Sequence, residues 1–232
     1  ISTLNCNAVL VSLPYTLAWN ASRGGLVDAN GVGTGFTMVD PPSARIAADG
    51  PTSNPQVPGY EPGRLAVNTA AGQLVVTSNK GIQTRDPSVS ANTNSQINAL
   101  GVGMVAPNGT FRITTTIVNP NFAGSSGNNF QQAGSWFGLN ENNFVKLVVL
   151  KTGATTAQVQ LLVENYDNNP TGPQPLEINT ATNAITNPGS ATITLIMEIN
   201  RIAGTVKAFY QVNGGPETAV QGGATLSVPA SF

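Results

Sequence analysis

The sequence predicts an all-β protein, an antiparallel two-sheet β-sandwich or jelly roll. Helical periodicity is nearly absent, whereas apolar and polar residues alternate with a period of two in many short runs. These runs recur at intervals of about ten to twenty residues and are separated by Gly, Asn and Pro. Hydrophobic residues make up 40% of the 232 residues, which is enough for a substantial core. Because we find no internal repeat and no clear boundary, we predict one domain over residues 1–232.

The first hundred residues contain candidate strands separated by long polar connections. A strand interrupted by Pro14 is expected over 9–19, a short strand over 35–40, and a hairpin over 63–82 with its turn near Gly72. The Pro-rich segment 47–63 and the polar segment 88–101 are predicted to be long loops, which in compact domains often carry function.

The remainder of the chain alternates more regularly. In the segment 110–119, one side of the predicted strand carries Phe111, Ile113, Thr115 and Ile117, and the other side carries Arg112, Thr114 and Thr116. Further strands are expected over 135–140, 144–151, 157–165, 191–200, 204–215 and 216–220.

A hairpin over residues 131–151 contains the most informative aromatic residue. Alternation places Val145, Leu147 and Val149 on one face of its second strand, and we expect Phe137 and Leu139 of the first strand to join them in the core. Because an unpaired lysine is costly to bury, the face that carries Lys146 should be the wetter one.

Trp136 then points to that wetter face, with a glycine on each side, and could serve as a platform for a sugar ring. The predicted ligand contacts are Trp136, Lys146, Asn140, Asn142 and Phe144. The alternative is that a long loop covers Trp136 in a second small core, since Trp is usually well buried.

The low charge argues against several classes of partner. Charged residues make up 9% of the chain, and 10 Lys and Arg against 11 Asp and Glu give a net charge of -1. Nucleic-acid binding and electrostatic membrane anchoring both need clustered basic residues. No apolar run approaches the roughly 20 residues of a membrane-spanning helix. The neutral Asn-, Thr- and Gly-rich composition suits an extracellular or cell-surface protein, and the initial Ile suggests a removed signal segment or a piece of a longer protein.

The residue types that support most catalytic mechanisms are missing. The chain has no His, which excludes Ser-His-Asp and Cys-His nucleophiles and His-based zinc sites. Glycoside hydrolysis needs two nearby carboxylates, but the spacing of Glu164 and Asp167 places them on opposite faces of a continuous strand. We therefore predict no enzymatic activity, although a carboxylate pair assembled from distant segments stays open.

One loop has the composition of a cation site. In the run Asp28-Ala29-Asn30-Gly31, alternate oxygen side chains precede a glycine, and Asp40 could add a carboxylate. Such oxygen ligands suit Ca²⁺. The alternative is that Asp28 and Asn30 only stabilise a turn by side chain–backbone hydrogen bonds.

Three segments resemble a known family. The run Ala133-Gly134-Ser135-Trp136-Phe137-Gly138-Leu139-Asn140-Glu141-Asn142-Asn143-Phe144-Val145-Lys146-Leu147 is similar to the AGLWFGLDEDNYVKL signature of bacterial concanavalin A-like (laminin-G-like) jelly-roll domains. The segments 31–42 and 209–215 resemble the N-terminal part and the late hairpin of these domains. The resemblance implies a concanavalin A-like jelly roll in a secreted or cell-surface protein. It implies no single function, because the wider superfamily contains lectins, glucanases and adhesion modules.

The sequence also departs from this family. Ser135 replaces the usual Leu, and Asn140 and Asn213 stand where the family often has Asp. The chain stops where relatives usually continue with a closing strand, so we expect either a fragment or a sheet edge left for a partner strand, with residues 1–20 as a possible donor. Cys6, the only cysteine, is expected to be a buried small side chain or an intermolecular link.

The leading functional prediction is a non-catalytic extracellular module that binds a glycan or a cell-surface polymer, or mediates adhesion beside neighbouring domains. The runner-up is a structural subunit that forms homo-oligomers, such as a filament or surface layer, by strand exchange. A laminarinase-like glycoside hydrolase is the third possibility.

Overall fold

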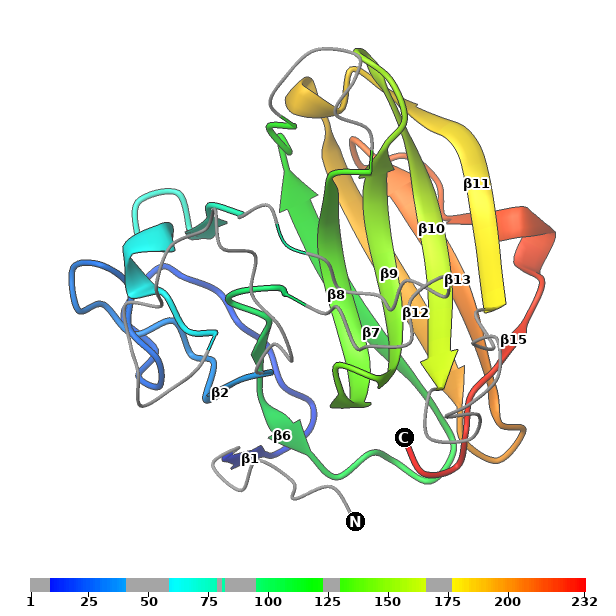
Figure 1. The fold of residues 1–232 in the computed structure, drawn as a ribbon, viewed down its shortest axis with the longest axis horizontal. Helices are drawn as coiled ribbons and strands as arrows, with labels where there is room; N and C mark the ends of the chain where they lie inside the picture. The colour runs from blue at the N-terminus through cyan, green and yellow to red at the C-terminus, as the bar shows by residue number, and fades with distance from the viewer. Residues whose placement is uncertain (1–8, 41–58, 79–80, 82–94, 123–129, 166–176) are drawn as a thin grey trace. The chain divides into compact units, whose positions relative to one another are not determined.

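The computed structural model describes residues 9–40, 59–78, 81, 95–122, 130–165 and 177–232 (Figure 1). The chain divides into two compact units, Ile1–Ala106 (unit 1) and Pro107–Phe232 (unit 2), each of which is considered by itself. The predicted single domain over residues 1–232 stays a prediction. Cys6, Asp167 and most of the two long polar connections lie outside the described residues.

The described residues form strands joined by turns and short 3₁₀ segments. The strands are β1 (Leu10–Val11), β2 (Met38–Val39), β3 (Leu65–Asn68), β4 (Gln73–Val76), β5 (Leu100–Gly101), β6 (Gly103–Met104), β7 (Thr110–Val118), β8 (Gln132–Asn140), β9 (Asn143–Lys151), β10 (Thr156–Asn165), β11 (Glu177–Thr186), β12 (Thr192–Asn200), β13 (Thr205–Val212), β14 (Thr218–Ala219) and β15 (Leu226–Ser227). The 3₁₀ segments are η2 (Pro62–Arg64), η4 (Pro188–Ser190) and η5 (Val220–Gly223). Within this part of the chain, no helix is long and apolar enough to cross a membrane.

Unit 1 contains short strands around a small core. β1 pairs in parallel with β6, and β2 pairs antiparallel with β5. The predicted hairpin over 63–82 is confirmed as β3 and β4, and Gly72 in its turn has a φ of 65° that favours glycine. The prediction of a long strand over 9–19 is wrong, because within this segment only Leu10 and Val11 form a strand, which pairs with β6. Pro14 follows closely and has no N–H with which to continue a ladder.

Unit 2 contains two antiparallel sheets. One has the order β11-β10-β9-β8, and its neighbours in space are neighbours in sequence. The other has the order β14-β13-β12-β7, with β15 also paired to β13. In this second sheet β7 pairs with β12, so that Thr116 lies opposite Thr194 although the two are 78 positions apart.

One hydrophobic core is shared by both sheets of unit 2, as expected for a β-sandwich. Leu147 and Val149 of β9 and Ile193 and Leu195 of β12 have no exposed surface and belong to the same cluster. Phe111, Ile113 and Ile117 of β7 pack against it, which confirms the predicted alternation of that strand. The predicted all-β class is confirmed, and the two antiparallel sheets are compatible with the predicted sandwich.

The first strand of the hairpin over residues 131–151 departs from simple alternation. Phe137 packs against the core as expected, but Leu139 is 42% exposed. The pairing of β8 with β9 shifts by one residue between Gly138 and Asn140, and this irregularity carries Leu139 out of the inward-facing row. The prediction that Leu139 faces the core is therefore wrong.

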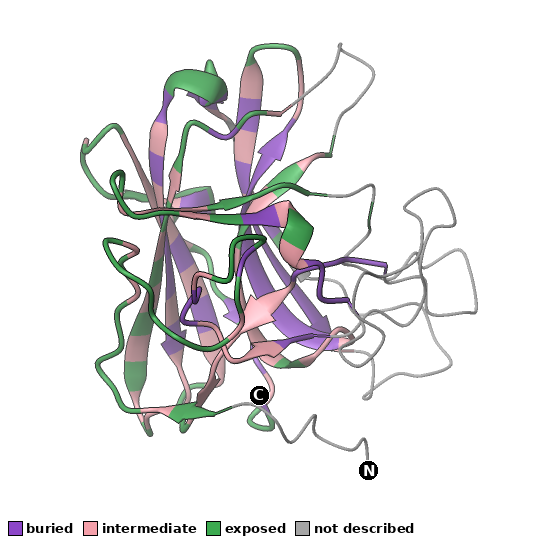
Figure 2. Cartoon of the chain, turned by 90° about the vertical axis from the view of Figure 1, so that its left-hand side faces the viewer, coloured by how far each residue is buried: buried purple, intermediate pink, exposed green. Residues whose placement is uncertain are grey.

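The centre of the four-stranded sheet is buried on both faces. Every residue of β9 is buried, from Asn143 to Lys151. Figure 2 shows buried stretches, in purple, along the strands of the interior. Alternate residues of this strand point to opposite sides of the sheet, so β9 has no solvent-facing side.

Candidate functional site

The face of β9 that carries Lys146 is the first candidate site, and the structure shows it to be dry. Trp136 lies opposite Lys146 in the β8–β9 register and is half-buried. Lys146 is only 2% exposed, and Phe144 is not exposed at all. The expectation that this face is the wetter one is wrong, because Lys146 shares it with Phe144, Val148 and Leu150, whose apolar surface favours burial.

The two glycines beside Trp136 have a structural role. A Cβ atom added at Gly134 would lie 2.0 Å from the carbonyl oxygen of Leu147, and one added at Gly138 would lie 2.3 Å from that of Asn143. The glycines therefore allow the backbone of β8 to approach β9 closely. They do not simply clear space around Trp136 for a ligand.

The asparagines of the same hairpin are engaged in its turn. Asn140 Oδ1 accepts a hydrogen bond from the backbone N–H of Asn142 at 2.9 Å and from Asn143 Nδ2 at 3.0 Å. Such side chain–backbone bonds stabilise tight turns. Ligand contacts by Trp136, Asn140 and Asn142 stay a prediction, whereas Lys146 and Phe144 are buried in this conformation.

Lys146 and Glu164 of the neighbouring strand are both buried and interact electrostatically. Lys146 lies opposite Leu162, and Glu164 lies opposite Phe144, so the two charged side chains are diagonal neighbours on one face of the sheet. Glu164 has no exposed surface. Burial lowers the pKa of Lys146 to about 8, although the charge of Glu164 opposes this effect.

This lowered pKa predicts a specific dependence of stability on pH. Because the folded-state pKa of about 8 lies below the unfolded value of 10.5, the unfolded chain binds more protons between these two pH values. The free energy of unfolding should therefore rise as the pH increases from 8 towards 10.5, by about 3 kcal/mol from this group. Urea unfolding across this range should show the rise in the wild type and in Lys207→Met. If the same rise in the free energy of unfolding persisted in Lys146→Met, Lys146 would not be its source.

Asp28 of unit 1 organises a loop through its carboxylate. Its Oδ2 accepts a hydrogen bond from Val67 N–H at 2.8 Å, and its Oδ1 accepts bonds from the N–H groups of Asn30 and Val32 at 2.8 and 2.9 Å. These bonds, chiefly that from Val67, hold the pKa of the Asp28 carboxyl below its ordinary value. The geometry is that of the alternative interpretation, in which Asp28 stabilises a turn and ties it to β3.

A cation at this loop would have to compete with those backbone donors. Among the described residues, no three His, Cys, Asp or Glu side chains are placed to hold a metal ion. Ca²⁺ bound by Asp28, Asn30 and Asp40 stays a prediction. A melting temperature that does not change on addition of EDTA would contradict it, since a bound ion stabilises the folded state.

The outer face of the β7–β12–β13 sheet carries a polar cluster around one arginine. Arg112 on β7 donates from Nη2 to Glu198 Oε2 at 2.8 Å and from Nη1 to Glu217 Oε2 at 3.1 Å. Its guanidinium carbon lies 5.2 Å from the centre of the Phe209 ring. The Arg112 cluster is defined as Arg112, Glu198, Phe209 and Glu217.

Neutral hydrogen-bonding side chains lie on the same face as the Arg112 cluster. Thr194 lies between Thr116 and Gln211 in register, and the hydroxyl oxygens of Thr116 and Thr194 are 3.4 Å apart. Thr114 and Thr116 are exposed on β7. The face therefore presents hydroxyl, amide, carboxylate and guanidinium groups together, all capable of bonding to hydroxylated ligands.

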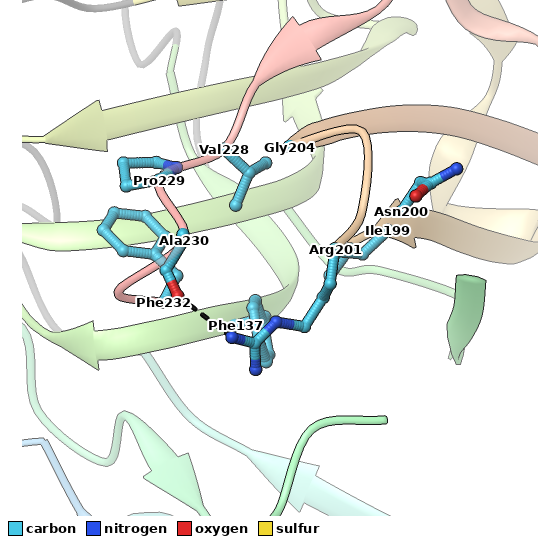
Figure 3. A pocket seen from close by; sticks show the side chains of 9 residues that line it. All are labelled: Phe137, Ile199, Asn200, Arg201, Gly204, Val228, Pro229, Ala230 and Phe232. Atoms are coloured by element: carbon cyan, nitrogen blue, oxygen red, sulfur yellow. Dashed lines mark hydrogen bonds between the residues drawn. The ribbon is translucent and has the colours of Figure 1, made fainter. Parts of the chain in front are cut away.

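A small recess near the chain end has little room for a ligand. It is formed where residues 228–232 pack beside Phe137 and Ile199, and its volume is about 10 Å³ (Figure 3). Arg201 Nη2 donates to the carbonyl oxygen of Ala230 at 2.9 Å and holds this segment in place. The space is about that of one water molecule.

Sequence patterns did not indicate the Arg112 cluster. Alternation places Arg112 on the outer side of its strand, but its partners Glu198 and Glu217 lie 86 and 105 positions further along the chain. Only the strand register brings the three side chains together, and periodicity within one strand carries no information about that register.

The comparisons with known proteins leave the family open. No family model, curated protein or solved structure matches the sequence. The resemblance to concanavalin A-like jelly-roll domains thus stays a prediction.

Proposed function

We propose that this chain is a non-catalytic, extracellular carbohydrate-binding or adhesion module of the jelly-roll type, and that it contacts glycan through the outer face of β7, β12 and β13. The observation that carries the proposal is the Arg112 cluster, in which two carboxylates and an aromatic ring hold one guanidinium. The same face also carries Thr116, Thr194 and Gln211.

The chemistry of this face suits a neutral polyhydroxylated ligand. Guanidinium and carboxylate groups are planar and can form paired hydrogen bonds with neighbouring hydroxyls. Arg112, Glu198 and Glu217 are restrained by their mutual contacts, so binding would cost less side-chain entropy than at free side chains. The low charge of the whole chain, with a net value of -1, also favours an uncharged polymer over a polyelectrolyte.

Replacing Arg112 with lysine tests this surface. Lysine keeps the positive charge but cannot hold two carboxylates in a planar fork, so we expect glycan binding to weaken by about tenfold or more. Glycan-array binding followed by calorimetry on the best hit would measure the loss. Arg64→Lys is the matched control, because Arg64 also pairs with a glutamate, Glu61, in unit 1 and should leave binding unchanged.

Two results would contradict the proposal. One is a folded wild-type protein that binds no glycan on a broad array. The other is binding that is equally strong in Arg112→Lys and in the wild type, which would exclude the Arg112 cluster as the contact surface.

The same geometry argues against hydrolysis by this cluster. Glycosidases keep one carboxylic acid protonated in an environment that disfavours its charge. Glu198 and Glu217 instead share one guanidinium on an exposed face, and each accepts a hydrogen bond from Arg112. Glu164 is fully buried and interacts electrostatically with Lys146. A module without catalysis therefore agrees better with these carboxylates than a laminarinase-like hydrolase does.

A second candidate function, self-assembly, is favoured by the edge of the second sheet. Within the described residues, β7 pairs only with β12, so one side of a nine-residue strand is available for pairing. Such an edge can add a strand from another copy. Of the proposed donor segment 1–20, Leu10 and Val11 pair with β6 of the same chain, and residues 1–8 lie outside the described part. Light scattering that shows a strict monomer at high concentration would exclude this function.

A further inference from the structure

The backbone of β7 has one edge that faces β12 and one edge that does not. At one end of the strand, Asn119 N–H donates to the Ala191 carbonyl at 2.9 Å. At the other end, Arg201 N–H donates to the Gly109 carbonyl at 3.0 Å. Both bonds continue the β7–β12 register. Because hydrogen-bonded and non-hydrogen-bonded pairs alternate along an antiparallel ladder, the odd-numbered residues of this strand direct their backbone groups to β12.

The even-numbered residues of β7 direct their backbone groups to the free edge of the strand. These residues are Thr110, Arg112, Thr114, Thr116 and Val118, and all of them are exposed. Within the described part of the chain, no backbone hydrogen bond outside the sheet reaches their N–H or carbonyl groups. The free edge of β7 is therefore a row of donors and acceptors that another strand can pair with.

The features that usually protect a sheet edge are missing from β7. Proteins commonly blunt edge strands with bulges, Pro, Lys or very short length. β7 has nine residues, pairs with β12 without a register shift, and contains neither Pro nor Lys. Among the other described edge strands of unit 2, the pairing of β8 and of β11 is irregular, and β14 and β15 have two residues each. β7 is thus the most regular of these edges.

The one charged side chain of β7 is turned towards its own sheet. Arg112 donates hydrogen bonds to Glu198 and Glu217. Its guanidinium carbon also lies 5.2 Å from the centre of the Phe209 ring on β13, beyond β12. The side chain therefore extends over the sheet and away from the free edge, and its charge is offset within the same copy.

The sequence of β7 is complementary to itself in an antiparallel pair. When Thr114 lies opposite Thr114 of a second copy, Arg112 lies opposite Thr116, so the two arginines do not face each other. On the inner side, Phe111 lies opposite Ile117 of the second copy. Both side chains are only partly buried in one copy, and an aromatic side chain opposite a β-branched one stabilises a strand pair. In this register the even-numbered residues of the two strands form the hydrogen-bonded pairs.

We infer that unit 2 binds a second copy of itself through β7, in the antiparallel register centred on Thr114. The inference rests on self-assembly, the second candidate function, and adds the identity of the partner strand. Pairing about a two-fold axis uses both free edges at once, so the assembly closes as a dimer and does not extend into a filament. The outer faces of the two sheets then lie on the same side and present two Arg112 clusters to one polymer.

Cysteine substitution at Thr114 tests the register. In a Cys6→Ser background, which removes the only natural thiol, Thr114→Cys should give a disulfide-linked dimer on mild oxidation. The Cα atoms of directly opposite residues in a hydrogen-bonded pair lie about 5.5 Å apart, which a disulfide can span. Thr110→Cys is the matched control, because Thr110 is exposed on the same side of the same strand but lies opposite Val118 of the second copy. It should give no linked dimer.

A charge at the same position tests the dimer in solution. Thr114→Lys places two ammonium groups opposite each other, and like charges in that position destabilise a strand pair. We expect the dissociation constant of the dimer, measured by sedimentation, to rise by about tenfold or more. Thr110→Lys is the matched control, since Thr110 and Thr114 are equally distant from Arg112 along the strand, and it should change the constant far less. Urea unfolding of both variants verifies that they fold.

The possible failures can be told apart. A wild-type protein that is strictly monomeric at high concentration would overturn this inference and self-assembly together, but not the glycan proposal, which Arg112→Lys tests separately. If the wild type assembles and Thr114→Cys gives no more linked dimer than Thr110→Cys does, only the pairing through β7 is wrong. A dissociation constant that is equal in Thr114→Lys and in the wild type would likewise overturn the inference.

Discussion

Replacing Leu147 with alanine is expected to lower the free energy of unfolding by about 2–5 kcal/mol, the usual cost of a large-to-small change in a packed core. Leu147 lies on β9, has no exposed surface, and belongs to the cluster that both sheets of unit 2 share. Because β9 is buried on both faces, its neighbours have little freedom to move into the space that the missing side chain leaves.

Leu139→Ala is the matched control for this experiment. The two leucines lie on paired strands of one hairpin, and simple alternation predicts both to face the core. Leu139 is 42% exposed, so its truncation should cost less than about 1 kcal/mol. Urea unfolding of both variants measures the difference. Equal losses would show that Leu139 is as well packed as Leu147 and would contradict the register shift at Gly138.

Replacing Gly134 with alanine should lower the free energy of unfolding by about 3 kcal/mol, at the upper end of the cost of overpacking. The added Cβ would lie 2.0 Å from the carbonyl oxygen of Leu147 and 2.8 Å from the Cα of Val148. Both are backbone atoms of β9, so relief of the clash requires β8 to move away from the centre of its sheet. The variant should unfold at a lower urea concentration than the wild type.

Gly63→Ala provides the comparison for Gly134→Ala. Its Cβ position has no neighbouring atom and its backbone is not left-handed, so the substitution should be neutral or stabilise slightly by restricting the unfolded chain. If Gly134→Ala lowered the free energy of unfolding no more than Gly63→Ala does, this result would contradict the close approach of β8 to β9.

Sequence patterns predicted the strands of unit 2 well because alternation is a local property. Phe111, Ile113 and Ile117 face the core as their spacing indicates. Leu139 does not, since a one-residue irregularity in pairing inverts every side chain beyond it. No composition rule marks such a shift before the partner strand is known.

The candidate site was harder to predict for a different reason. One charged residue predicts a solvent-exposed Lys146 face, but the three apolar residues on that face favour its burial. The charge of Glu164 offsets part of the cost of burying Lys146. The Arg112 cluster combines residues from distant parts of the chain. Only tertiary structure brings these residues together, so motif spacing could not have found the cluster.

The pairing of β7 with β12 has a consequence for how unit 2 folds. The strands β8 to β11 can join one after another through short or moderate connections, whereas Thr116 and Thr194 meet only after a loop of 78 positions closes. Loop closure of that length is entropically costly and slows the formation of non-local contacts. We therefore expect the β8–β11 meander to form first and β7 to dock late, an order that pulse-labelled hydrogen exchange would reveal as delayed protection of β7. During that interval the inner side of β7, with Phe111, Ile113 and Ile117, is exposed, and the nascent chain is then most vulnerable to aggregation.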